Sequence, residues 1–119
     1  MDDFYYKKLD AYKLAKKLTI YVYDQIRKFP EYEKFALTSQ VRRAAVSVTS
    51  NIAEGMSRSS NKEVAHFLEI SYGSLMEVQS QLEIAQLLNY MTKESLDEID
   101  PKTEEIAKML SGLKMSKLH

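Results

Sequence analysis

The chain contains one pair of residues with the spacing of a metal-binding motif. Glu63 and His66 form an E-x-x-H pattern. Four-helix bundles that hold two iron ions use two such patterns and two further inward-facing glutamates. The only other histidine is His119 at the end of the chain, and Ser60 with Glu63 forms the pattern of a helix-capping box. We therefore expect His66 to lie on the surface, with no metal site.

Residues for covalent or phosphate chemistry are also missing from the sequence. There is no cysteine nucleophile, and none of the 3 glycines belongs to a phosphate-binding loop. His66 has no serine and aspartate partners at helical spacing that would build a catalytic triad. We expect a protein that is not an enzyme and that has no cofactor.

The remaining candidates for chemistry are basic side chains. Lys13 and Lys17 are interleaved with tyrosines in the first predicted helix, and Arg42 and Arg43 are adjacent in the second. Such cations contact phosphates, and tyrosine rings stack on bases. In the alternative reading, the lysines form a solvated face whose stems cover apolar surface. In the corresponding alternative for Arg42 and Arg43, the two arginines form ion pairs with a carboxylate such as Glu54 at a subunit interface.

The charges are unevenly distributed, although the formal net charge is zero. Residues 1–60 carry 11 basic and 7 acidic side chains, a net of +4, and residues 61–119 carry 6 basic and 10 acidic ones, a net of −4. This asymmetry indicates either a surface that faces a polyanion or two halves that complement each other within a bundle or between subunits.

Length and composition limit the architecture. A chain of 119 residues forms one domain with a core of its own. It has no cysteine, no apolar run of membrane-spanning length and no signal-peptide pattern at its beginning. We expect a single domain over residues 1–119, in the reducing cytoplasm.

Apolar residues recur at steps of three and four in four segments, which predicts four amphipathic helices. The connections between them are short, and the turn Asn89–Met91 makes the last two helices antiparallel. The predicted fold is all-α, an antiparallel up-down-up-down four-helix bundle. Its helices span residues 9–28, 38–55, 60–88 and a segment from 92 that runs through Pro101 and frays over 115–119.

Several local features follow from the same patterns. Thr38 or Ser39 is expected to cap the second helix, and Gly55 to end it in the left-handed conformation. The aromatic rings of Tyr32 and Phe35 are expected to tuck back onto the bundle. Ser71, Gly73 and Ser74 are expected to form a narrow waist where a neighbouring helix approaches closely, because a mid-helix glycine is otherwise unfavourable.

The second helix carries a second face of apolar and small residues beside its core stripe. This face comprises Val46, Thr49 and Ala53. A helix with two such faces is buried on two sides, and in a four-helix monomer the extra face would be exposed. It therefore predicts an interface with another copy of the chain.

The run from Phe35 to Gly55 contains the blocks Arg-Arg-Ala-Ala and Ser-Asn-Ile-Ala-Glu-Gly. With Arg58 and the later run up to Tyr90, it resembles the bacterial family of 23S rRNA intervening-sequence proteins. Two departures occur, at Thr49, where the family often has proline, and at 56–57, where it usually has an aromatic residue and glycine.

This resemblance implies a homo-oligomeric four-helix bundle, commonly a pentamer. Some relatives look like accessory subunits of retroelement reverse transcriptases and bind nucleic acid through basic surfaces, so RNA or a nucleic-acid enzyme is an implied partner. Carried over by position, Arg42, Arg43 and Arg58 would face nucleic acid. Two hypotheses follow: an oligomer that binds RNA, or a structural adaptor that binds a protein and has no nucleic-acid role.

Overall fold

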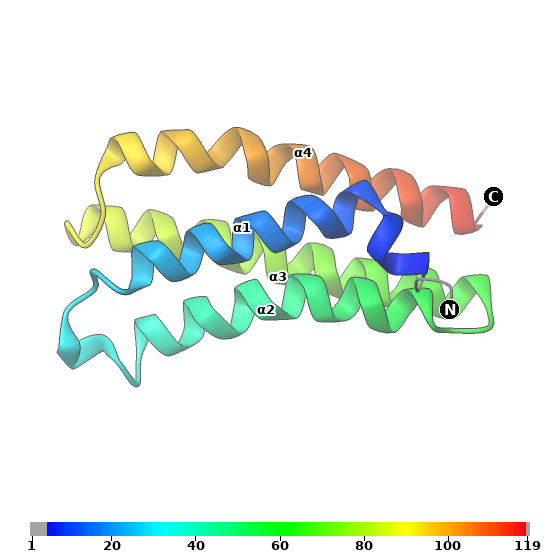
Figure 1. Ribbon diagram of the computed structural model, residues 1–119, viewed down its shortest axis with the longest axis horizontal. Helices are drawn as coiled ribbons and strands as arrows, with labels where there is room; N and C mark the ends of the chain where they lie inside the picture. The colour runs from blue at the N-terminus through cyan, green and yellow to red at the C-terminus, as the bar shows by residue number, and fades with distance from the viewer. Residues whose placement is uncertain (1–4, 119) are drawn as a thin grey trace.

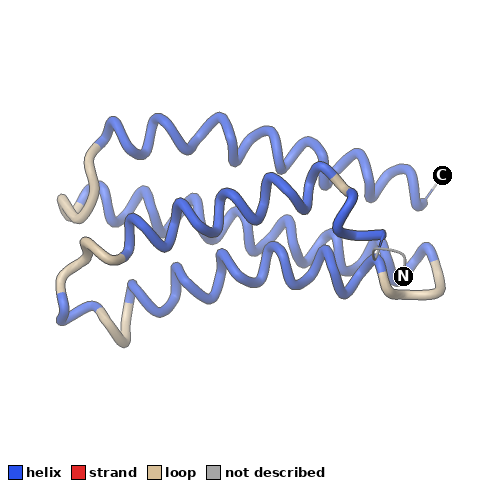
Figure 2. The backbone as a smooth tube through the Cα atoms, in the orientation of Figure 1, coloured by secondary structure: helices blue, strands red, loops and turns tan. Residues whose placement is uncertain are grey.

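A computed structural model describes residues 5–118, which form a bundle of four long helices (Figure 1). Two short 3-10 helices, η1 and η2, precede and follow the first long helix (Figure 2). No β-strand occurs among the described residues. The elements in order are η1 (Tyr5–Lys8), α1 (Asp10–Ile26), η2 (Glu31–Glu33), α2 (Leu37–Met56), α3 (Asn61–Leu87) and α4 (Lys93–Leu118).

Consecutive helices pack side by side, and α1 also contacts α4. The pairs α1–α3 and α2–α4 are therefore diagonal. The α1–α2 connection and the α3–α4 turn share one end of the bundle, and η1 lies at the other (Figure 1). This arrangement confirms the predicted all-α, up-down-up-down bundle. None of the described helices is both long and apolar enough to span a membrane.

The core is built from the predicted stripes of apolar residues. Each helix contributes side chains at steps of three and four, which places them on one face. Burial of such side chains is the main favourable contribution to folding. The largest fully buried ones are Val22, Val41, Val48, Ile52, Leu68, Leu75, Val78, Leu82, Ile99, Thr103, Ile106 and Leu110. Leu88, the last residue of the predicted helix 60–88, is 49% exposed because it lies just beyond the end of α3.

The beginning of α2 differs from the prediction. Ala36 is the N-cap residue and provides no side-chain hydrogen bond, so neither Thr38 nor Ser39 caps the helix. The Thr38 hydroxyl is instead buried without a hydrogen-bond partner. The Glu33 carboxylate accepts a hydrogen bond from the backbone N–H of Leu37 at 3.4 Å. A carboxylate is favourable at this end of a helix because it faces the positive end of the helix dipole.

Gly55 also has a different role from the one predicted. It has no positive φ, and α2 continues through it to Met56. A Cβ placed on Gly55 would lie 2.8 Å from the Cβ of Phe67 in α3. Glycine is therefore needed here because the two helices approach closely.

The close approach expected at Ser71, Gly73 and Ser74 occurs at the two serines, whose hydroxyls hydrogen-bond to α2 at 2.7 Å and 2.8 Å. It does not occur at Gly73, where a Cβ would have no neighbour within 4 Å.

The predicted starts of α3 and α4 are confirmed. The Ser60 hydroxyl accepts a hydrogen bond from the Glu63 N–H at 3.1 Å. The Thr92 hydroxyl accepts one from the Ser95 N–H, also at 3.1 Å. One continuous helix runs through Pro101, as predicted, and reaches Leu118. The expected fraying was wrong for residues 115–118, and His119 lies outside the described residues.

The aromatic residues of the α1–α2 connection do not tuck back onto the bundle as expected. Phe35 is 90% exposed and Tyr32 is 77% exposed. The Tyr32 hydroxyl does hydrogen-bond to that of Tyr90 at 3.0 Å, which ties the connection to the α3–α4 turn. The exposure of Phe35 leaves an apolar ring at this end of the molecule.

Candidate nucleic-acid interface

Arg42 and Arg43 are exposed on the outer surface of α2. Neither forms an ion pair or a hydrogen bond through its side chain with another residue that the structure describes. Arg27, by contrast, pairs with Asp24 at 2.9 Å, and Arg58 pairs with Glu54. Arg42 and Arg43 therefore present full positive charges to solvent.

A hollow of about 500 Å³ lies beside these arginines. It is lined by one residue of α1, Tyr23, and otherwise by residues of α2. The Thr19 hydroxyl donates a hydrogen bond to the Ala45 carbonyl at 3.2 Å, which joins α1 to α2 nearby. The arrangement brings guanidinium donors next to an aromatic ring, a combination that suits phosphate contacts and base stacking. The lining residues are Tyr23, Arg42, Arg43, Val46, Ser47 and Ser50.

Lys13 and Lys17 lie on a different side of α1. The Tyr21 hydroxyl donates a hydrogen bond to the Ser95 carbonyl at 3.0 Å, so the Tyr21 side of α1 faces α4. Lys17 is four residues before Tyr21, and Lys13 is four before Lys17, which places all three on one side of the helix. Both lysines are exposed. The structure does not bring them together with Arg42 and Arg43.

The Arg58 side chain is held in place by Glu54 and Phe67. Its guanidinium donates a hydrogen bond to the Glu54 carboxylate and lies 4.7 Å from the centre of the Phe67 ring. Within one chain Glu54 pairs with Arg58, while Arg42 and Arg43 lie about three turns earlier on the same helix and are too far away to reach it. Their pairing with Glu54 of another subunit stays a prediction. Arg58 therefore joins the end of α2 to α3, and its charge is partly neutralised.

The predicted second face of α2 lies at the surface. Val46 is 39% exposed, while Thr49 and Ala53 are half-buried. The Thr49 hydroxyl donates a hydrogen bond to the Val46 carbonyl at 2.8 Å, so its polar group is satisfied within the helix. The sequence did not predict η1, which contacts α2. The role of these three residues at a subunit interface stays a prediction.

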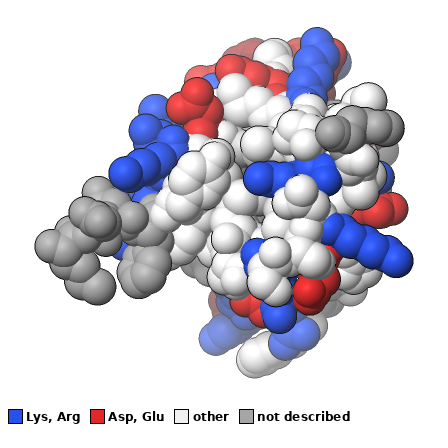
Figure 3. Space-filling model, turned by 90° about the vertical axis from the view of Figure 1, so that its right-hand side faces the viewer, with Lys and Arg blue, Asp and Glu red and all other residues white. Residues whose placement is uncertain are grey.

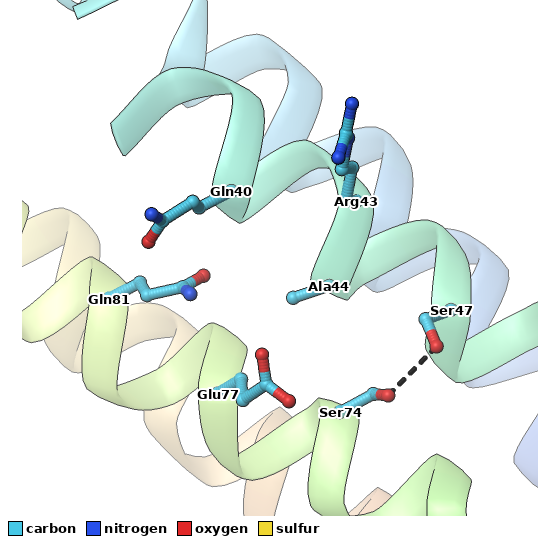
Figure 4. Close-up of a pocket in the computed structure, with 7 residues that line it drawn as sticks. All are labelled: Gln40, Arg43, Ala44, Ser47, Ser74, Glu77 and Gln81. Carbon is cyan, nitrogen blue, oxygen red and sulfur yellow. Dashed lines mark hydrogen bonds between the residues drawn. The ribbon is translucent and has the colours of Figure 1, made fainter. Parts of the chain in front are cut away.

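A second concave region, the α2–α3 cleft, was missed by reasoning from sequence. It has a volume of about 310 Å³. The Ser47 and Ser74 hydroxyls hydrogen-bond across it at 2.8 Å. Figure 4 shows the Gln40 and Gln81 side chains on facing sides of the gap between α2 and α3 and the Arg43 guanidinium directed away from that gap. The lining residues are Gln40, Arg43, Ala44, Ser47, Ser74, Glu77 and Gln81. The sequence feature that could have predicted this cleft is the recurrence of polar residues at steps of three and four, beside the core stripes of α2 and α3.

The uneven charge along the sequence does not produce ion pairs between the two halves. Every ion pair between described residues joins two residues of the same half, as Lys114 and Glu69 do at 3.5 Å. At the end of the bundle that holds η1, basic and acidic side chains lie among one another (Figure 3). Mutual neutralisation of the halves by ion pairs within one chain is therefore not observed.

His66 is exposed, and its ring contacts that of Phe67 with 5.7 Å between ring centres. Glu63, three residues earlier, is part of the capping box at the start of α3. Among residues 5–118, no group of three or more histidines and carboxylates is placed to hold a metal ion.

Comparison with known proteins identifies the family. The family model described as "23S rRNA-intervening sequence protein" matches residues 7–112, nearly the whole chain. The chain belongs to this family. No curated protein matches it with significance.

A solved structure of a protein from the S23 ribosomal protein family has the same fold. This protein of unknown function, from Bacteroides thetaiotaomicron, superposes with a TM-score of 0.80 at 21% sequence identity. The match covers 87% of this chain and 97% of the other. At this identity the comparison supports the four-helix bundle of the intervening-sequence protein family and does not extend to ligands.

The two departures from the usual family sequence are both accommodated in α2. The helix passes through Thr49 without interruption and continues to Met56, with Ser57 as its C-cap. The Ser57 hydroxyl donates a hydrogen bond to the Glu54 carbonyl at 2.7 Å, which satisfies one of the last carbonyls of the helix. Neither departure therefore alters the path of α2.

Proposed function

We propose that this intervening-sequence protein is a non-enzymatic homo-oligomer that binds single-stranded RNA through α2. The observation that carries the proposal is the pair of exposed arginines, Arg42 and Arg43, which lack acidic partners in the described chain. They lie beside the Tyr23 ring in a hollow. Arginine is well suited to phosphate because its planar donor groups match phosphate oxygens.

The oligomer is the second part of the proposal. Val46 lies four residues after Arg42 on α2 and is 39% exposed. Val46 also lines the hollow, so a ring of subunits that buries this face would place the hollow at each subunit boundary and would repeat the Arg43 side of α2 once per subunit. Repetition would increase the affinity for an RNA that reaches several subunits at once. We propose a pentamer in the cytoplasm, in keeping with the family resemblance and the absence of cysteine.

The test is RNA binding as a function of salt. Fluorescence anisotropy of a labelled single-stranded RNA should show affinity that falls steeply with salt, because bound phosphates release counterions. The double variant Arg42→Glu and Arg43→Glu should abolish binding while light scattering shows the assembly intact. The variant Lys13→Glu and Lys17→Glu makes the same charge change on another side of α1, and it should weaken binding much less.

Binding that is indifferent to both salt and the arginines would contradict the RNA proposal. The second candidate function is then a structural adaptor for a protein partner. The observation in its favour is the exposed apolar end of the bundle, where Phe35 is 90% and Leu87 is 71% exposed. An adaptor predicts no retained RNA and one co-purifying protein that is lost on Phe35→Ser.

A further inference from the structure

The α2–α3 cleft contains polar groups that the described part of the protein does not satisfy. The Gln81 Oε1 atom is buried and has no hydrogen-bond partner. The side chains of Gln40 and Glu77 form no hydrogen bond or ion pair with other described residues, although both line the cleft. Gln40 and Glu77 are exposed, whereas Gln81 Oε1 is a buried acceptor. A buried polar atom without a partner costs free energy, so a ligand that brings a donor to Gln81 Oε1 is favoured.

The inner wall of the cleft, in contrast, is satisfied internally. The Ser47 and Ser74 hydroxyls bond to each other at 2.8 Å. The Asn51 amide also donates to the Ser47 hydroxyl at 2.8 Å. The groups left for a ligand are therefore a carboxylate and two amides. In Figure 4 the Glu77 carboxylate points from α3 toward α2, and the two amides lie farther along the same cleft.

We propose that this cleft binds a guanine base of the RNA, an inference that rests on the proposed RNA-binding function. The Glu77 carboxylate accepts hydrogen bonds from guanine N1–H and the N2 amino group, which lie side by side on one edge of the base. The second hydrogen of the N2 amino group is donated to Gln81 Oε1, and an amide N–H of Gln40 donates to O6. The cleft volume of about 310 Å³ accommodates a purine.

The other bases fit the carboxylate less well. Adenine and cytosine each place a ring-nitrogen acceptor beside their amino group, and uracil places its one N–H between two carbonyl oxygens. Each of these arrangements sets an acceptor against the carboxylate oxygens. Single-stranded RNA exposes the pairing edges of its bases to such contacts. The chemistry of the cleft therefore selects guanine.

Arg43 links the cleft to the rest of the proposed RNA site. It lines both the cleft and the hollow beside Tyr23. Its guanidinium lies at the rim and points away from Glu77 (Figure 4). This position suits a contact with the phosphate next to the bound base, which adds affinity without selecting a base.

The test compares labelled RNAs that differ at one position. A twelve-nucleotide oligouridine is measured beside versions in which one central uridine is replaced by guanosine, inosine or adenosine. The guanosine probe should bind the native protein about tenfold more tightly than oligouridine, the range expected for a two-bond base contact. Inosine lacks the N2 amino group and should lie between guanosine and adenosine.

Glu77→Gln should remove the preference for guanosine while affinity for oligouridine stays the same or rises. Glu83→Gln is the matched control, since Glu83 is an exposed carboxylate of α3 outside the cleft; it should retain the preference. Equal affinity for all probes, or a preference that survives Glu77→Gln, overturns the guanine site and leaves RNA binding standing. Failure of every probe to bind the native protein overturns both proposals.

Discussion

The Tyr90 hydroxyl donates a hydrogen bond to the Glu33 carboxylate at 2.8 Å. This contact joins the α3–α4 turn to the α1–α2 connection, two segments that are far apart in the sequence. The other oxygen of the same carboxylate accepts from the backbone N–H of Leu37 at the start of α2. Glu33 therefore holds this end of the bundle together. It also supplies the side-chain hydrogen bond to the start of α2 that Ala36, the N-cap residue, cannot provide.

The Tyr90–Glu33 contact predicts a loss of stability at alkaline pH. Hydrogen bonds with Tyr32 and Glu33 raise the pKa of Tyr90 above the usual value near 10. The protonated hydroxyl is therefore favoured in the folded state. Its contribution is complete below about pH 10 and is lost as the pH rises further. Urea unfolding between pH 8 and 11 should show a smaller alkaline decline for Tyr90→Phe than for the native protein.

Tyr5→Phe is the control for general tyrosine ionisation, because Tyr5 is 60% exposed. Its alkaline decline should match that of the native protein. Identical declines for Tyr90→Phe and the native protein would show that the contact does not couple folding to Tyr90 ionisation.

Gly55, near the end of α2, and Gly73, in the middle of α3, should respond in opposite directions to alanine. Gly55→Ala forces its new Cβ against Phe67, 2.8 Å away, and should destabilise the protein by about 1–3 kcal/mol, the usual cost of overpacking. Gly73→Ala meets no neighbour within 4 Å and should stabilise it by about 0.5–1 kcal/mol through helix propensity. Urea unfolding at one fixed protein concentration measures both. Stabilisation by Gly55→Ala would contradict the close packing of α2 on α3.

Ser71 provides a buried hydrogen bond between α2 and α3. Its hydroxyl is fully buried and donates to the Val48 carbonyl at 2.7 Å. Ser71→Ala should destabilise the protein by about 1 kcal/mol, the typical net value of such a bond. Ser80→Ala, at an exposed position of the same helix, should be neutral or slightly stabilising. Thermal unfolding of the two variants under identical conditions gives the comparison.

Alanine substitutions at Arg58 and Arg42 should differ in their effects on stability and on RNA affinity. Arg58→Ala removes the Glu54 ion pair and the contact with the Phe67 ring, and should cost about 1 kcal/mol of stability. Arg42→Ala has no such partner to lose and should change stability by less than about 0.5 kcal/mol. The order should reverse for RNA affinity, where Arg42→Ala has the larger effect. A larger loss of RNA affinity for Arg58→Ala would relocate the proposed site to the end of α2.

A charged residue at Val46 should prevent the chain from forming its proposed oligomer. Val46→Glu places a charge in the proposed interface and should reduce the mass from a multiple of 13.8 kDa to 13.8 kDa, because burying an unpaired carboxylate is costly. Ile84→Glu alters a similarly exposed apolar residue on α3 and should leave the assembly intact. Light scattering after size exclusion measures both, and a native protein that elutes as a monomer would refute the interface.

Much of the fold could be predicted from the sequence because its determinants are local. Steps of three and four define each amphipathic face. The capping box at Ser60 and Glu63 uses residues one turn apart, and Thr92 caps α4 in the same way. The predictions were wrong where contact with another helix determines the role of a residue. Gly55 was expected to end α2 by its conformation, whereas proximity to Phe67 is what requires glycine there.

The candidate site was predictable only in part. Adjacent arginines are visible in any sequence, but whether acidic side chains of other elements reach them depends on tertiary packing, and none of the described ones does. The sequence alone determined four helices, their order and the side of each that is buried, since these follow from helical periodicity. Only the tertiary structure decided that Gln40 and Gln81 line one cleft and that Tyr90 reaches Glu33. Such contacts depend on how far each helix is rotated about its axis and shifted along its neighbour, and packing of the whole core sets both.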